Sequence, residues 1–246
     1  MIAQHVDAGA KDAAERLEGA GLPTRRVESY HYTDLKALLR EVPDMGAPAN
    51  EASPPAFSVP GAYRIAIVNG VVQQAGTAPA GVIAGTVEGG VLSERDDVLV
   101  RLNAGLCGTA LSLDLDNDVA PVIHIDRRIE GAAVHVADGA KIYVGDGAKA
   151  VIVESYSGSD AAHLGNHASY IALGKGAELT HILVDVSGAS VRHFASVDYG
   201  LAENAKLTSL GRNFGSALSR TPIFANLPGE GAHGDCRGLF LTAAEP

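Results

Sequence analysis

The hydrophobic residues in the second half of the chain come in short β-rich runs, and glycine or asparagine turns separate these runs. Each turn phrase closes on an alanine, and these alanines stand at positions 148, 177, 205 and 232, in steps of 29, 28 and 27 residues. A repeat of about 28 residues, made of short strands without a helical period between them, is typical of a parallel β-solenoid. The pattern predicts about four coils that begin near Gly131, and it assigns Asp138-Gly139-Ala140 to one further turn.

The first half of the chain has two helical patterns followed by a proline-rich stretch. Residues 8–20 are alanine-rich and charged, and residues 34–40 carry leucines at helical spacing behind a candidate N-cap, Thr33. Residues 43–61 contain five prolines and no periodicity, which predicts an extended linker. We therefore expect three parts: an N-terminal helical region over residues 1–42, a linker over residues 43–61 and a β-helix core over residues 62–246.

Several short strands are predicted between the linker and the repeat. Residues 64–73 contain Asn69-Gly70, a dipeptide that favours a tight hairpin turn between two strands. Residues 98–104 are ambiguous, and a short helix is one interpretation of them. Strands are also expected at residues 81–87, 111–116 and 121–125. A last strand-like run, residues 237–242, would open another coil. Because a solenoid end is normally capped, we expect an open end here and a chain that lacks a C-terminal part.

Composition fits a narrow core and argues against some partners. Apolar residues make up 46% of the chain but aromatic residues only 5%, as expected where valine, isoleucine and alanine fill a thin interior. The formal net charge of −10, without a Lys/Arg-rich block, argues against nucleic acid and against anionic membrane surfaces. The N-terminus lacks the apolar run of a signal peptide, and no stretch of 18 apolar residues occurs, so we expect a cytoplasmic protein.

Three histidines are the first candidates for chemistry. His163 and His167 are four residues apart, a spacing that suits a metal ion on a helix, but they lie between predicted strands. His193 is close to one coil away from His163, which would stack these two side chains. Because stacked polar ladders occur on solenoids without any ligand, we predict no metal site among them.

The two cysteines, Cys107 and Cys236, cannot form a disulfide framework or a closed zinc site. Cys236 lies in a segment with His, Asp and Arg, and a nearby cation would favour its thiolate. An idle or packed thiol is the simpler interpretation for both. We therefore assign no catalytic, metal-binding or cofactor-binding residue.

Several segments resemble one family. The phrase from Gly21-Leu22-Pro23 to Tyr32-Thr33-Asp34-Leu35 is similar to the N-terminal phrase of the SufD branch of the SufB/SufD family, which takes part in SUF iron–sulfur cluster assembly. Residues 67–71 resemble the first hairpin of that family, and residues 102–104 resemble its Leu-Asn segment. Residues 227–232, which follow Arg220, and Gly238-Leu239 resemble a late coil. The resemblance covers nearly the whole chain in the right order.

The resemblance implies a right-handed β-helix that serves as a scaffold and is not an enzyme. Its partners would be SufB and the ATPase SufC, and a cluster would be present only transiently, in the complex, with no other bound cofactor. The family's C-terminal helical domain, which docks SufC, and a late histidine near the cluster lie beyond residue 246. Docking of SufC would then need the missing C-terminal domain, and no ligand residue is carried over.

Three other classes compete with this interpretation. A purely structural β-solenoid without a metal role stays open, as does a homodimer at the unsealed end. A carbohydrate-active β-helix enzyme would need carboxylates paired across a cleft and is poorly matched by a chain with few aromatic residues. A left-handed acyltransferase helix would need apolar residues every six positions, whereas the steps here are about 28.

Overall fold

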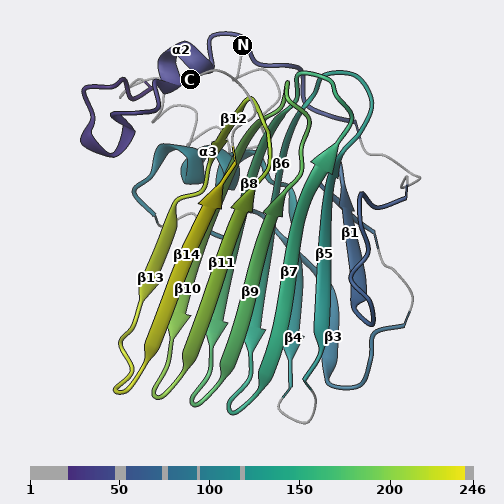
Figure 1. Cartoon of the computed structure of the whole chain (residues 1–246), viewed down its shortest axis with the longest axis vertical. Coiled ribbons are helices and arrows are strands. Elements are labelled where there is room, and N and C mark those ends of the chain that lie inside the picture. Colours follow the sequence, from purple (N-terminus) through teal and green to yellow (C-terminus); the bar gives the residue numbers. More distant parts are fainter. Residues whose placement is uncertain (1–21, 48–53, 74–76, 93–94, 117–119, 242–246) are drawn as a thin grey trace.

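The computed structural model describes residues 22–47, 54–73, 77–92, 95–116 and 120–241. Strands dominate these residues, and two seven-stranded sheets pack face to face around one apolar core (Figure 1). Most neighbouring strands within each sheet are parallel. This arrangement confirms the predicted fold class, a mainly β parallel solenoid. The helix predicted over residues 8–20 lies outside the described residues.

The first sheet has the spatial order β14-β11-β9-β7-β5-β1-β2. Its strands are β1 (Tyr63–Val68), β2 (Val71–Gln73), β5 (Val122–Ile129), β7 (Lys149–Gly158), β9 (Glu178–Asp185), β11 (Lys206–Asn213) and β14 (His233–Phe240). Strands β1 and β2 pair antiparallel around Asn69-Gly70, which confirms the predicted hairpin. Residues 237–240 of the expected run at residues 237–242 form the second half of β14, so this last strand begins earlier than predicted, and residue 242 lies outside the described residues.

The second sheet has the order β12-β10-β8-β6-β4-β3, with β13 also paired to β10. Its strands are β3 (Val82–Glu88), β4 (Thr109–Leu115), β6 (His135–Val144), β8 (Leu164–Leu173), β10 (Arg192–Leu201), β12 (Leu218–Arg220) and β13 (Ile223–Asn226). The strands predicted at residues 81–87, 111–116 and 121–125 correspond to β3, β4 and β5. Strand β3 pairs antiparallel with β4.

The strand register reproduces the sequence repeat. Lys149 pairs with Glu178, Glu178 with Lys206, and Lys206 with His233, which are steps of 29, 28 and 27 residues. Equivalent residues of successive coils therefore stack directly on one another. The predicted corners also form, because Gly147, Gly176, Asn204 and Gly231 have φ values of 70°, 64°, 55° and 70°. Glycine adopts this left-handed conformation freely, and asparagine tolerates it better than most residues.

Two predictions about the start of the solenoid are wrong. The stacking begins before Gly131, because β4 already pairs in parallel with β6, and β5 pairs in parallel with both β1 and β7. Asp138-Gly139-Ala140 is no turn, since it lies in the middle of β6. Gly139 is part of this strand. Because it has no side chain, the backbone of β6 can pack closely against the side chains of Ala110 and Val91.

The outer face of the second sheet is covered by helical segments. The ambiguous residues 98–104 form part of helix α3 (Val98–Leu106). The side chain of Asp97 caps the N-terminus of this helix by accepting hydrogen bonds from the backbone N–H groups of Leu99 and Val100. Leu99 and Leu102 of this helix pack against Leu164 and Phe194 of the sheet, together with residues of the N-terminal region.

The N-terminal region is held on the same face. It contains the short helices η2 (Glu28–Tyr30) and α2 (Leu35–Leu38), and α2 is shorter than predicted. Its N-cap is Asp34 rather than Thr33, because the Asp34 side chain accepts from the backbone N–H of Ala37. The Tyr30 hydroxyl donates to Asp97 at 2.8 Å, and this contact joins the region to α3. The division at residues 42 and 61 stays a prediction.

The interior of the solenoid is apolar toward the corners described above. Alternate residues of each strand point inward, so leucine, isoleucine and valine from both sheets meet in layers. Five of the inward side chains in this part are exposed by 1% or less: Leu113, Ile123, Ile142, Ile152 and Ile171. We call these five residues the apolar cluster. Toward the other end of the strands, the inward positions are occupied by charged and polar residues.

Candidate functional site: a buried ionic network

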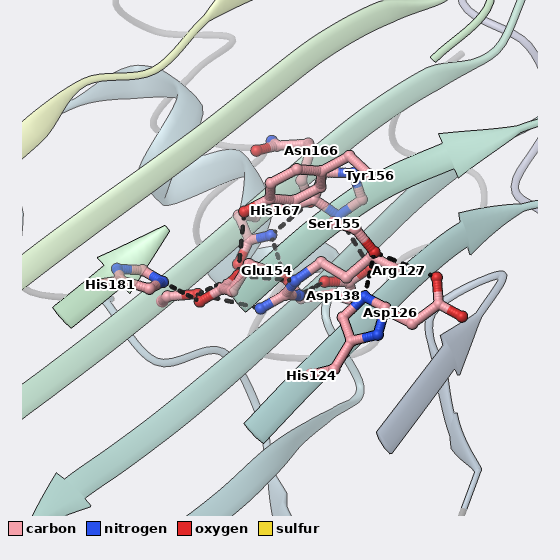
Figure 2. A network of polar contacts seen from close by, with 12 residues as sticks. His124, Asp126, Arg127, Asp138, Glu154, Ser155, Tyr156, Asn166, His167 and His181 are labelled. Carbon is pink, nitrogen blue, oxygen red and sulfur yellow. Dashed lines mark hydrogen bonds and ion pairs between the residues drawn. The ribbon is translucent and has the colours of Figure 1, made fainter. Parts of the chain in front are cut away.

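A network of charged side chains lies between the two sheets (Figure 2). Strand β5 supplies Arg127, β6 supplies Asp138, β7 supplies Glu154, β8 supplies His167 and β9 supplies His181. We call these five residues the ionic cluster, and each of them is exposed by 3% or less. Because charges are rarely buried unless they are paired, the contacts within this cluster decide whether it is stable.

Arg127 is the centre of the cluster. Its Nε donates to Glu154 at 3.0 Å, one terminal nitrogen donates to Asp138, and the other donates to the Ser169 hydroxyl at 3.0 Å. Burial by itself would lower the pKa of Arg127, but the charges of Asp138 and Glu154 outweigh it and raise the pKa above its usual value. The guanidinium is therefore permanently charged and shared by two carboxylates.

Glu154 is surrounded by donors. The Tyr156 hydroxyl donates to it at 3.0 Å, the Ser169 hydroxyl donates at 2.9 Å, and His181 Nε2 lies 3.2 Å from Oε1. Burial would raise the pKa of Glu154, but Arg127 and the contact with His181 outweigh burial and lower it well below its usual range. Glu154 is therefore an anion whose oxygens are already occupied by protein groups.

Asp138 is the second buried anion. His167 Nδ1 lies 2.9 Å from its Oδ2, while Arg127 donates to Oδ1. Burial would raise the pKa of Asp138, but His167 and Arg127 lower it. Both carboxylates of the cluster are thus matched by cationic or hydrogen-bonding partners.

The polar contacts continue into the next coil. His181 Nδ1 lies 2.6 Å from the Tyr199 hydroxyl, which lies 2.9 Å from the Ser209 hydroxyl. In β9, Asp185 accepts from Asn213 at 2.6 Å and from Ser216 at 2.9 Å. Polar groups therefore follow the stacking direction of the solenoid from β5 to β11.

A separate polar group lies on the outer face of the first sheet. His124 Nε2 lies 2.8 Å from the Ser155 hydroxyl, which donates to Asp126 at 3.3 Å. Arg64 Nε also donates to Asp126 at 2.9 Å, and Phe57 stacks on the His124 ring with centroids 5.3 Å apart. These residues attach the segment around Phe57 to the sheet and do not reach the ionic cluster, because they point to the opposite face.

The three candidate histidines do not form one group. The register pairs His193 with Gly165 rather than with His163, so the expected stack of His163 and His193 is wrong. His163 Nδ1 accepts from the backbone of Val134 at 3.2 Å, and its Nε2 lies 2.8 Å from the Ser159 hydroxyl. His167 and His193 do meet, with ring centroids 5.3 Å apart.

The two cysteines have different surroundings. Cys107 is buried at the end of α3, as expected for a packed thiol, and burial raises its pKa to about 12. Cys236 is exposed and lies within β14. Burial of the sulfur, followed by the charge of Asp235, raises its pKa, so the expected effect of a nearby cation is not present.

Arg127, Asp138 and Glu154 were not among the candidates from sequence. A signal for them exists in the repeat, because Arg127, Tyr156, Asp185 and Asn213 occupy one inward column in successive coils. A charged residue in such a column must be buried. The repeat alone could not identify its partners, since Asp138 comes from the opposite sheet.

The network joins the two sheets, because Arg127 pairs with Asp138 of one sheet and Glu154 of the other. Within the described part of the chain, no group of three or more His, Cys, Asp or Glu side chains is arranged to hold a metal ion. The two central carboxylates are ion-paired and inaccessible, whereas a general base must reach its substrate. No helix among the described residues is long and apolar enough to cross a membrane.

Fold and site together define a β-solenoid with a charged interior and a helical region on one face. Residues 128–245, a little under half of the chain, match the family model described as SUF system FeS cluster assembly, SufBD core domain. The match supports the SufB/SufD family and a role in SUF iron–sulfur cluster assembly, which implies partners from that machinery. It does not distinguish SufD from SufB. No curated protein matches the chain.

Proposed function

We propose that the protein is a SufD-type scaffold subunit that acts in the cytoplasm with SufB and the SufC ATPase. The observation that carries the proposal is the SufBD core match over residues 128–245, which covers the regular coils of the solenoid. In this proposal the chain is not an enzyme and has no resident cofactor. The iron–sulfur cluster is cargo that is present only in the assembled complex.

The contacts inside the solenoid support a scaffold over an enzyme. Asp138 and Glu154 are the two carboxylates that most resemble a catalytic acid–base pair. However, each is fully buried and forms an ion pair with Arg127. A carbohydrate-active enzyme needs two carboxylates that flank a bound sugar, so this arrangement does not favour that class. An interior whose central carboxylates are ion-paired is compatible with a docking scaffold.

Co-purification tests this proposal. The tagged chain is co-expressed with SufB and SufC, in parallel with a culture that lacks SufB. We expect SufB to co-elute with the chain, and SufC to co-elute when SufB is present, because the proposal places the chain in one complex with both. Light scattering of the chain alone then tests the alternative of a homodimer.

Two outcomes would contradict the proposal. The first is a folded chain, verified by circular dichroism, that retains neither SufB nor SufC. The second is a complex that contains SufB but no SufC, because the proposal requires the chain to act with both. The Glu178→Gln variant serves as the control, since it changes an exposed ion ladder between Lys149 and Lys206 and leaves the interior intact.

A further inference from the structure

Strand β3 is an open edge of the second sheet. It pairs with β4 along its whole length, and no described strand lies on its other side. It stands at the opposite side of the stack from β13 and β14 (Figure 1). Open edges are commonly protected by lysine, proline or a bulge. β3 has none of these, because its sequence is VIAGTVE and its register with β4 runs without interruption.

The backbone of β3 offers hydrogen bonds to a further strand. At both ends of the β3–β4 ladder, odd-numbered residues bond toward β4: Gly89 donates to Gly108 at 2.9 Å, and Gly81 accepts from the residue after β4 at 2.8 Å. Because the hydrogen-bonding direction alternates along an antiparallel strand, Ala84 and Thr86 direct their N–H and C=O groups to the open side. Neither residue has a backbone partner there among the described residues.

The outer face of β3 carries two exposed apolar side chains. Ile83 is exposed by 71% and Val87 by 38%, although burial of such side chains is favourable. They flank Gly85 symmetrically, two residues on either side of it. Ala84 packs against the apolar core, so Ile83, Gly85 and Val87 share the opposite face of the strand.

We propose that β3 pairs antiparallel with β3 of a second copy of this chain, around a two-fold axis at Gly85. In this register Ala84 of each copy bonds to Thr86 of the other, which uses the free backbone groups. Ile83 then lies directly opposite Val87 of the second copy, in a non-hydrogen-bonded pair, where side chains are closest. Registers centred on Ala84 or Thr86 also use the free backbone groups, but they separate the two apolar side chains.

Charge and shape are compatible with this pairing. Glu88 is the only charged residue of β3, and the register places it opposite Val82 of the second copy, so the two Glu88 carboxylates stay apart. At the axis, a Cβ built on Gly85 meets no atom within 4 Å, so the outer face is open there. Because one strand from each copy gives a small interface, the dimer is weak and dissociates on dilution. The pairing does not depend on the proposed scaffold role.

Cross-linking through an introduced cysteine tests the register. Gly85→Cys, in a Cys236→Ser background, places two thiols at the axis, where the Cα separation of about 4.5 Å suits a disulfide. We expect oxidised glutathione to link the two copies and to release two equivalents of reduced glutathione. The matched control is Ile83→Cys, whose two thiols lie about 13 Å apart along the strands, so it should cross-link about tenfold more slowly or less. Mixed with Val87→Cys, it should form the mixed disulfide.

Two further variants test the pairing without a new cysteine. Ile83→Lys places a charge against an apolar side chain, and Thr86→Pro removes an N–H that points away from β4, so both keep the β3–β4 ladder. We expect each to raise the dissociation constant of the dimer about tenfold or more, measured by light scattering over a dilution series. Leu239→Lys, on the exposed end strand β14, is the matched control and should leave this constant unchanged.

A dimer through β3 and a dimer through β14 have the same mass, so the variants decide between the two edges. Circular dichroism verifies that each variant is folded. The proposal is overturned by a wild-type chain that stays monomeric at every concentration, or by Ile83→Cys that cross-links as fast as Gly85→Cys. It is also overturned by a dimer that Leu239→Lys dissociates while folded Ile83→Lys does not.

Discussion

The apolar cluster and the ionic cluster occupy the same narrow interior but are stabilised in different ways. Around Ile123, Ile142 and Ile152, one apolar side chain can be exchanged for another of equal volume at little cost. Around Arg127 the geometry is specific, because two carboxylates from opposite sheets share one guanidinium. Hydrophobic burial is non-directional, whereas a buried ion pair stabilises only one relative position of the sheets. The comparison suggests that the ionic cluster defines how the two sheets are aligned.

The largest expected effect comes from removing the central charge. Arg127→Met leaves Asp138 and Glu154 buried without a cation, and breaking a buried pair in this way costs about 3–5 kcal/mol of unfolding free energy. Urea denaturation followed by circular dichroism measures this loss. The control is the triple variant Arg127→Met, Asp138→Leu, Glu154→Met, which removes all three charges and should recover most of the stability. A triple variant no more stable than the single variant would refute the role of unpaired charge.

A smaller loss is expected in the apolar cluster. Ile152→Ala opens a cavity at a fully buried position, and such substitutions cost about 2–5 kcal/mol, with about 3 kcal/mol as the central expectation. Ile152→Val should cost about 1 kcal/mol, since it removes one methyl group. The same urea experiment compares the two. An equal loss in both variants would contradict simple cavity formation.

The smallest expected effect is a pH dependence of the unfolding free energy. The apolar cluster does not contribute to it, because its residues do not titrate. Burial chiefly lowers the pKa of His135 to about 4, while an unfolded histidine titrates near about 6.5. The unfolded chain therefore binds more protons between these values, so the stability contributed by His135 is complete above about 6.5 and is lost as the pH falls toward about 4. Between pH 7 and pH 5 this should amount to about 2 kcal/mol.

Comparison of variants isolates the histidine contribution. His135→Gln should reduce the fall in unfolding free energy between pH 7 and pH 5, whereas Ile152→Ala should keep the wild-type slope, because it changes no titratable group. Urea denaturation at several pH values measures both slopes. A wild-type slope in His135→Gln would mean that other groups cause the pH dependence.

The sequence predicted the solenoid well because its signal is local and repeated. The corner residues Gly147, Gly176 and Asn204 need left-handed backbone, and their spacing equals the observed register. Strands β3, β4 and β5 were also found, since each is a short apolar run. Asp138-Gly139-Ala140 was misread because the same residue types that make a turn occur inside β6, where Gly139 allows close packing.

The site was largely missed because its contacts join residues from different sheets. Asp138 and Arg127 are close in sequence but reach each other only across the interior, and Glu154 approaches from the next coil. The pairing of His193 with Gly165 rather than with His163 depends on a two-residue difference in register, which a period of about 28 residues does not resolve. Exact register is set by packing of the whole coil and not by one strand.

The most direct test of the scaffold role is the iron and acid-labile sulfide content of the complex. The chain is co-purified anaerobically with SufB and SufC, and the chain alone is purified in parallel. We predict iron and sulfide together in the complex, and no acid-labile sulfide in the isolated chain. Iron and sulfide in the isolated chain, or a complete complex without either, would contradict the account.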